Sequence, residues 1–112
     1  MPGSEREIAS SPPQVETGKV DNIIARKLEV FSDWEVGPDV TVGDRTFKTL
    51  KFTWNRNPSV EYFLDCGTSA FVVCGFEMDF DDPDMKAFLE SVELSDRMES
   101  DWNKAAQVKA AA

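Results

Sequence analysis

The side chains best suited to binding a metal ion form an acidic run near residue 80. Four aspartates supply the oxygen ligands that Ca²⁺ takes: Asp79, Asp81, Asp82 and Asp84. Their spacing is not that of an EF-hand loop. Pro83 is favoured at the first position of a helix, and acids in the first turn are favoured by the helix macrodipole. We therefore interpret the run as the start of a helix, with Asp82 as its N-cap, and predict no metal site.

Residues for nucleophilic or acid–base catalysis are scarce. The chain has no histidine, which excludes Ser-His-Asp and Cys-His arrangements and any histidine-ligated metal. Cys66 and Cys74 would need a lysine or a helix N-terminus for activation, so we interpret them as buried, reduced thiols. Glu61 and Asp65 share a strand face with Phe63, but no general-acid partner accompanies them. The sequence identifies no catalytic residue and no cofactor, and we do not expect an enzyme.

Residues 46–78 carry the longest strand-like pattern and should form the centre of a sheet. Leu50, Phe52 and Trp54 alternate with polar residues, so they share one face. Gly67 can take the positive φ of a tight hairpin. The expected pieces are a strand at 46–54, a turn at 55–59, a strand at 60–65, a hairpin at 66–69 and a strand at 70–78.

The register of the last two strands follows from their hairpin. If Gly67 and Thr68 are the two loop residues, Leu64 lies opposite Phe71. One face then carries Val60, Tyr62, Leu64, Phe71 and Val73, and the other carries Phe63, Val72, Cys74, Phe76 and Met78. Both faces are apolar, unlike a sheet with one face in water. We therefore expect the second face to be covered by a helix or by a partner chain.

Helices and one further strand complete an α+β fold. A short strand at 39–42 turns through 43–44 into the next strand, which gives a four-stranded antiparallel meander sheet with helices packed on it. Helical spacing of apolar residues predicts a helix over 20–31, with a strand at 27–31 as the alternative. A second helix should follow Pro83, with an apolar stripe of Met85, Phe88, Leu89 and Val92.

The predicted domain spans residues 19–95. Residues 1–18 are rich in serine, proline and scattered charges, so we expect a disordered N-terminal tail. Residues 96–112 carry Met98 and Trp102 but few other apolar anchors, so we expect a weakly helical or disordered C-terminal tail.

The order of these elements resembles the C-terminal half of the PsbP/Mog1/DcrB-like superfamily. The matching segments are Phe47–Trp54, Val60–Leu64, Phe71–Phe76, Asp79–Asp84 and Phe88–Leu94. They are hydrophobic patterns rather than catalytic signatures, and the chain lacks room for the usual N-terminal strands of a full member. The resemblance implies an α+β sandwich of sheet and helices with a binding role, and it transfers no functional residue.

The net charge of −9, from 12 basic and 21 acidic residues, restricts the kind of partner. It disfavours nucleic acid, whose binding depends on phosphate neutralisation, and anionic membranes. No apolar run reaches the ~18 residues of a membrane span. Residues 1–7 lack the apolar core of a signal peptide, so we expect a cytoplasmic protein. Residues 77–101 hold ten acidic against two basic residues, which suits a basic protein partner.

We therefore predict a non-catalytic protein-binding module: an adaptor, a chaperone-like factor or an inhibitor. Its partner surface combines acidic and apolar residues: Asp79, Asp81, Asp82, Asp84, Phe63, Phe76 and Trp102. Trp34 and Trp102 could equally be exposed anchors or caps at the core edges. An incompletely covered sheet face also favours a homodimer or a stable complex. The alternative is a small enzyme or ligand-binding domain, with an aromatic pocket between sheet and helix lined by Phe52, Trp54, Tyr62 and Phe71.

Overall fold

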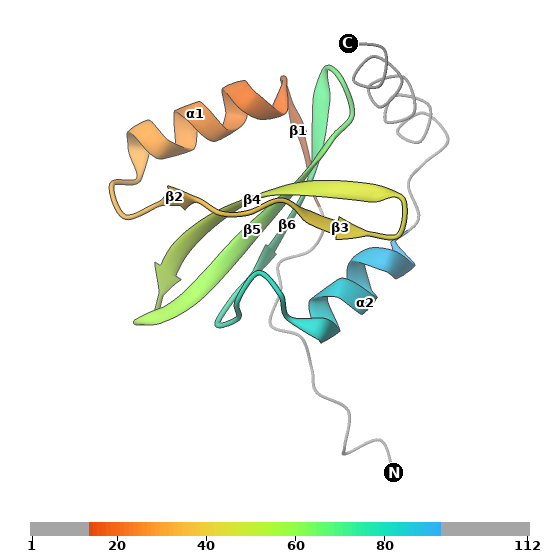
Figure 1. Cartoon of the computed structure of the whole chain (residues 1–112). Helices are drawn as coiled ribbons and strands as arrows, with labels where there is room; N and C mark the ends of the chain where they lie inside the picture. The colour runs from red at the N-terminus through yellow and green to blue at the C-terminus, as the bar shows by residue number, and fades with distance from the viewer. Residues whose placement is uncertain (1–13, 93–112) are drawn as a thin grey trace.

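The computed structural model of the protein describes residues 14–92. In this range a six-stranded antiparallel sheet lies between α1 on one face and α2 on the other (Figure 1). The elements are β1 (Gln14–Thr17), α1 (Val20–Val30), β2 (Glu35–Val36), β3 (Val40–Val42), β4 (Arg45–Trp54), β5 (Asn57–Asp65), β6 (Ser69–Gly75) and α2 (Pro83–Ser91). The strand order is β1-β6-β5-β4-β2, and β3 also pairs with β4. The α+β class and the antiparallel sheet are confirmed, whereas the count of four strands is wrong because β1 and β2 extend the sheet.

The sheet begins earlier in the chain than the composition indicated. β1 pairs antiparallel with β6, and Thr17 lies opposite Ser69. Residues 14–17 are therefore not part of a tail: a short polar strand is held by backbone hydrogen bonds, which composition does not reveal. Residues 1–13 and 93–112, where the rest of the expected tails falls, lie outside the described residues.

β2 and β3 follow one another along the same edge of β4. Between them, the Gly37 N–H donates to the carbonyl of Thr49 (3.0 Å), and the Thr49 hydroxyl donates to the carbonyl of Pro38 (2.7 Å). A Cβ on Gly37 would lie 2.5 Å from that hydroxyl oxygen, so only glycine fits this approach. This close approach of residues 37–38 to Thr49 separates the edge of the sheet into two short strands, β2 and β3.

The β4–β5 hairpin is tighter than expected. Asn55 (φ 50°) and Arg56 (φ 66°) both take the left-handed conformation of a two-residue type I′ turn. β5 consequently begins at Asn57, within the segment predicted as a turn, and it contains Pro58. Pro58 lies opposite Thr53 and beyond the last residue that pairs with β6, so its missing N–H removes no bond from the sheet.

The register of β5 and β6 is confirmed, since Leu64 lies opposite Phe71. Each face of the sheet carries its own core cluster. The buried residues toward α2 are Val40, Val42, Phe47, Val60, Tyr62, Leu64, Cys66, Phe71, Val73, Met78, Met85 and Leu89. Those toward α1 are Val20, Ile23, Leu50, Phe63, Ala70 and Val72. The helix over 20–31 is thus confirmed against the strand alternative, and it covers much of the second face.

Met78 was expected on the same face as Phe63 and Val72, but it lies in the cluster toward α2, whereas Phe63 and Val72 lie toward α1. β6 ends at Gly75, and Glu77 takes a φ of 56°, which turns the chain out of the sheet. Met78 then folds back over Gly75, where a Cβ would collide with the Met78 sulfur. Strand alternation therefore stops before Met78.

Asp82 caps α2 as predicted, and its replacement tests the cap. Its carboxylate accepts hydrogen bonds from the N–H groups of Asp84 and Met85, both at 3.0 Å. Asp82→Ala leaves these donors without the carboxylate, so we expect the free energy of unfolding to fall by about 1 kcal/mol in urea denaturation. Asp81→Ala, at the exposed neighbouring position, should change it by less than about 0.5 kcal/mol. Equal losses would mean that negative charge, not the cap, stabilises the helix.

Candidate functional site

Five aromatic rings form a continuous group on the α1 face of the sheet, near the β4–β5 hairpin. We call Phe31, Trp34, Phe52, Trp54 and Phe76 the aromatic surface. Phe31 stacks on Trp34 with ring centroids 4.7 Å apart, and Trp34 stacks on Phe52 at 4.4 Å. Phe76 meets Phe52 edge-on at 6.3 Å and lies 5.1 Å from Trp54. These are favourable geometries for aromatic pairs, so each ring is held by its neighbours.

The aromatic surface is assembled from the ends of several elements. Phe31 follows α1, Trp34 precedes β2, Phe52 and Trp54 belong to β4, and Phe76 follows β6. α1 ends before this part of the sheet, and no described helix covers it (Figure 1). Trp54 is consequently 50% exposed and Phe31 42% exposed, whereas Phe52 is buried. Exposed apolar patches of this kind are typical of contact sites.

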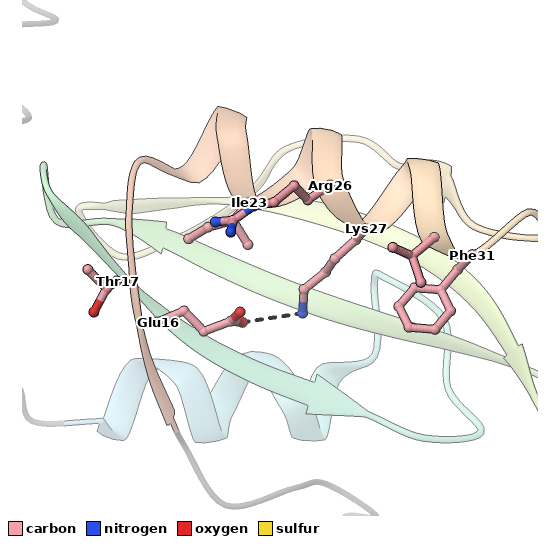
Figure 2. A pocket seen from close by; sticks show the side chains of 7 residues that line it. Glu16, Thr17, Ile23, Arg26, Lys27 and Phe31 are labelled. Atoms are coloured by element: carbon pink, nitrogen blue, oxygen red, sulfur yellow. Dashed lines mark hydrogen bonds and ion pairs between the residues drawn. The ribbon is translucent and has the colours of Figure 1, made fainter.

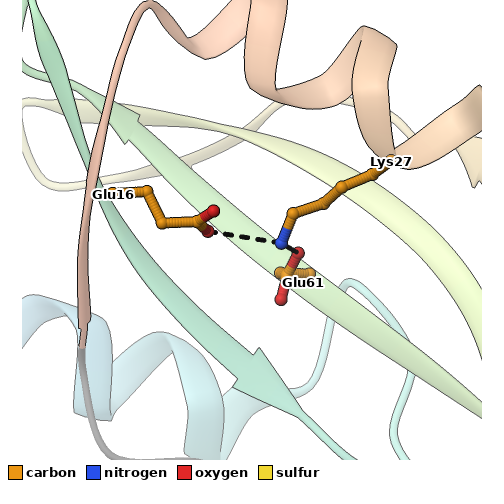
Figure 3. A network of polar contacts seen from close by, with 3 residues as sticks. All are labelled: Glu16, Lys27 and Glu61. Carbon is orange, nitrogen blue, oxygen red and sulfur yellow. Dashed lines mark hydrogen bonds and ion pairs between the residues drawn. The ribbon is translucent and has the colours of Figure 1, made fainter. Parts of the chain in front are cut away.

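An ion-pair network adjoins the aromatic surface beneath α1 (Figure 3). The Lys27 ammonium, from α1, donates to Glu61 Oε1 on β5 (2.5 Å) and to Glu16 Oε2 on β1 (3.2 Å). It also lies 5.3 Å from the ring centroid of Phe63 and 5.8 Å from that of Trp34, within cation–π range. The network ties the helix to the centre and to one edge of the sheet.

Burial and neighbouring charges have opposite effects on the pKa values of Lys27 and Glu61. Burial by itself would lower the pKa of Lys27, but the hydrogen bonds and charges of Glu61 and Glu16 outweigh it, so the pKa of Lys27 is raised. Burial also raises the pKa of Glu61, and here the single neighbouring ammonium offsets it only in part. Lys27 is therefore a charged structural group at neutral pH and a poor general base.

Both cysteines are buried, reduced thiols. Cys74 lies opposite Glu61 in the sheet. Burial, together with the charge of Glu61, raises the pKa of the Cys74 thiol to about 12. A nucleophilic cysteine needs the opposite shift, so this thiol is not prepared for catalysis.

The buried thiol predicts a loss of stability in alkali. A group whose pKa is raised on folding stabilises the protein fully below its unfolded pKa, here 9.0, and loses that contribution as pH rises through its folded pKa, about 12. Above pH 9 we expect the Cys74 thiol to lower the free energy of unfolding by about 1.4 kcal/mol per pH unit. Cys74→Ala should remove this part of the slope in urea denaturation, while the part from Tyr62, whose pKa is also raised by burial, should remain. If Cys74→Ala leaves the slope unchanged, the pKa of the Cys74 thiol is not raised by burial.

A hollow of about 360 Å³ lies beside the ion-pair network, between α1 and β1 (Figure 2). It is lined by Glu16, Thr17, Ile23, Arg26, Lys27, Val30 and Phe31. Glu16 and Lys27 point toward each other across it and form an ion pair. Phe31 belongs to both the hollow and the aromatic surface, so the two are continuous.

Comparisons of the chain with models of protein families, with curated proteins and with solved structures give no match. The resemblance to the PsbP/Mog1/DcrB-like superfamily therefore stays a prediction. The role of the site has to be inferred from its own geometry.

The four aspartates predicted for partner binding lie on the α2 side of the sheet, away from the aromatic surface. Asp82 is engaged as the helix cap, and Asp84 is half-buried beside it. Asp79 and Asp81 are exposed. The carbonyl of Asp79 also accepts from the Tyr62 hydroxyl (3.5 Å), which anchors the loop to the core on that face. These acids do not form one surface with Phe63 and Phe76, which belong to the α1 face.

Of the three aromatic residues predicted for partner binding, the two that the structure describes lie in different environments. Phe76 is part of the aromatic surface. Phe63 is 0% exposed under α1, so it belongs to the core and is not available to a partner. Trp102 lies outside the described residues. Trp34 is half-buried and stacked within the aromatic surface.

The aromatic pocket of the alternative prediction does not form. Phe52 lies on the α1 face, where it stacks on Trp34, and Trp54 shares its side of β4. Tyr62 and Phe71 lie in the cluster toward α2. The sheet therefore separates the two pairs of rings.

The other acidic side chains considered for catalysis already have hydrogen-bond partners within the protein. The Asp65 carboxylate accepts from the N–H of Gly67 in the β5–β6 hairpin (2.8 Å), and Glu61 binds Lys27, so the two acids do not act as a pair. Across residues 14–92, acidic and thiol side chains form no group that could hold a metal ion. None of the helices in that range is long and apolar enough to cross a membrane.

Sequence reasoning missed Phe31, Lys27 and Glu16. For Lys27 a signal was present: it is the i+4 neighbour of Ile23 on the core-facing side of the helix. Glu61 is likewise the one charge in the apolar stretch 60–64. A lone base and a lone acid in buried segments indicate a pair, because an unpaired buried charge is costly. Glu16 gave no such signal, since its strand was not expected.

Proposed function

We propose that the protein is a non-catalytic binding module that holds a protein partner on the aromatic surface, as an adaptor, a chaperone-like factor or an inhibitor. The observation that carries this proposal is the set of five rings that contact one another in a continuous group, of which Trp54 and Phe31 are about half exposed. Aromatic residues contribute much of the binding energy at the centres of interfaces. Rings that are ordered before binding lose little further entropy when a partner arrives.

The engaged state of the reactive groups supports binding over catalysis. The Cys74 thiol has a raised pKa, Glu61 is held by Lys27, and Asp65 closes a turn. General acid–base or nucleophilic catalysis requires such groups to be accessible to a substrate and suitably charged.

The charge around the aromatic surface supports a basic partner. Asp33 and Glu77 are exposed and lie next to Trp34 and Phe76 in the sequence. Lys27, beneath the same rings, is neutralised by two carboxylates. With a net charge of −9, the chain should attract basic proteins and favour their docking here. The reduced cysteines favour a reducing compartment such as the cytoplasm.

The test is loss of the partner when the exposed rings are removed. A protein that co-purifies with the tagged wild type from the cells that make it should be lost with the double variant Phe31→Ala/Trp54→Ala. With that partner in pure form, calorimetry should show that Trp54→Ala alone weakens binding by about 2 kcal/mol, roughly thirtyfold.

Val15→Ala is the matched control, because Val15 is exposed on β1 and lies opposite Phe71 on the other face. It should leave binding unchanged. Light scattering of the wild type separates a homodimer from a complex with another protein. Full retention of the partner by the double variant would contradict the proposal.

A further inference from the structure

The edge of β4 beside the aromatic surface is open over Phe52–Trp54. β3 pairs with residues 45–47, and β2 pairs with Leu50 and Lys51. Beyond Lys51, no described strand lies on this side of β4. A turn closed by the Trp34 N–H on the carbonyl of Phe31 (3.2 Å) instead carries the chain up to α1. The last residues of β4 therefore present an unpaired strand edge.

The register shows which backbone groups face outward here. Trp54 and Asn57 flank the two-residue turn and form a hydrogen-bonded pair, and such pairs alternate along antiparallel strands. Thr53 consequently points its N–H and carbonyl away from β5. The pairing of Thr49 supports this orientation. Thr49 lies four residues before Thr53, so its backbone groups point to the same edge of β4, and its carbonyl accepts a hydrogen bond from the Gly37 N–H (3.0 Å). Thr53 thus offers one donor and one acceptor to a strand laid beside it.

A hollow of about 240 Å³ lies along this open edge. It is lined by Asp33, Glu35, Lys51, Phe52, Thr53, Arg56 and Pro58. Its two exposed carboxylates, Asp33 and Glu35, flank Trp34 in the sequence, and Glu35 lies opposite Lys51 and so on the α2 side of the sheet. Of the two bases, Lys51 holds its ammonium 5.4 Å from the Phe80 ring centroid on the α2 side, and Arg56 lies in the hairpin turn.

We propose that an extended segment of the partner, carrying arginine or lysine, adds as a strand to β4 at Thr53. This inference rests on the proposed function and states how the partner is bound. Alternate side chains of an added strand point to opposite faces, so every second one lies over the aromatic surface. There Trp34 and Trp54 suit a cation. The side chains between them lie over the hollow, where Glu35, on the same side of the sheet as Lys51, offers a carboxylate to a base. Backbone bonds supply affinity, while the side chains supply specificity.

Charge selects this occupant over a second copy of the chain. A second copy would bring another net charge of −9 to the same edge, and its repulsion opposes the pairing of two β4 edges. A basic segment instead meets carboxylates, aromatic rings and free strand positions together.

The proposal is tested by fluorescence anisotropy of short, capped, dye-labelled peptides on the full chain. The probe alternates arginine and valine; its counterparts replace arginine by glutamate, or carry N-methyl groups on alternate backbone amides in either register. We expect the arginine peptide to bind and the glutamate peptide to bind at least about tenfold more weakly. N-methylation in one register should weaken binding about tenfold, because it removes the donors that a strand needs.

Two substitutions at Thr53 separate backbone from side-chain effects. Thr53→Pro removes the outward N–H without removing a bond to β5, and should weaken binding about tenfold. Thr53→Val keeps that N–H and should bind like the wild type. If thermal melting shows that Thr53→Pro is unfolded, the N-methyl comparison on the wild type decides alone.

The outcomes distinguish this inference from the proposed function. Equal binding of methylated and unmethylated arginine peptides overturns strand addition, and so does absence of any arginine-peptide binding while Phe31→Ala/Trp54→Ala still loses the partner. Dimers in light scattering that Thr53→Pro dissociates would show a second copy to be the occupant. Retention of the partner by the double variant would instead contradict the aromatic surface itself.

Discussion

Lys27→Met should lower the free energy of unfolding by about 3–5 kcal/mol at neutral pH, measured by urea denaturation. The substitution keeps most of the apolar stem but removes the ammonium that holds Glu61 and Glu16. Glu61 is 8% exposed, so its carboxylate is left buried without its cation. Removing one partner of a buried ion pair costs about this much, because the other charge stays desolvated.

The pH dependence of the loss identifies its cause. The pKa of Glu61 is already raised by burial, and without Lys27 it should rise further. A carboxyl with a raised folded pKa stabilises fully below its unfolded pKa, here 4.5, and loses that contribution as pH rises through the folded pKa. The deficit of Lys27→Met should therefore be small in acid and grow toward neutral pH. A deficit that does not change with pH would point to lost packing instead.

A second substitution should restore much of the stability. In Lys27→Met/Glu61→Gln no buried charge remains, so the double variant should be more stable than Lys27→Met alone at neutral pH. Arg26→Met is the control, since Arg26 is the exposed neighbour on the same helix. It should change the free energy of unfolding by less than about 0.5 kcal/mol.

The central sheet was accessible from sequence because its signals are local. Alternation in residues 46–54 and the glycine hairpin at Gly67 set the faces and the register, and Asp82 with Pro83 marked the start of α2. Each of these features depends on neighbours in the chain, so side-chain type suffices to predict it.

The remaining strands depend on distant contacts. β1 has no apolar alternation, and its place is fixed by pairing with β6 far along the chain. β2 is interrupted at Gly37, where the reason is a close approach to Thr49. Neither strand can be read from its own residues.

The candidate site was only partly visible in the sequence for a related reason. Phe76 was identified, but the face it shares with Phe31 and Trp34 arises where α1 ends over the sheet. Phe63 was assigned to a partner surface because the cover provided by α1 was left open. The distinction between an exposed and a covered ring on the same strand face depends on the length of a helix elsewhere in the chain.

That distinction makes Phe63→Ala the second substitution of large effect. The ring is fully buried in the α1 cluster with Val20 and Ile23, and it contacts the Lys27 ammonium at 5.3 Å from its centroid. Its removal leaves a cavity and removes the cation–π contact with the Lys27 ammonium. We expect a loss of about 3–5 kcal/mol in the free energy of unfolding, measured by urea denaturation.

Two further substitutions test whether Phe63 is a core residue or a partner-binding residue. Phe63→Leu keeps most of the apolar volume and should recover much of the loss. Phe76→Ala, at a half-buried ring of the aromatic surface, should cost less stability than Phe63→Ala and yet weaken partner binding more, once each variant is measured below its melting temperature. If Phe63→Ala instead kept the stability of the wild type and lost the partner, α1 would not cover this ring, and Phe63 would belong to the binding surface as the sequence first indicated.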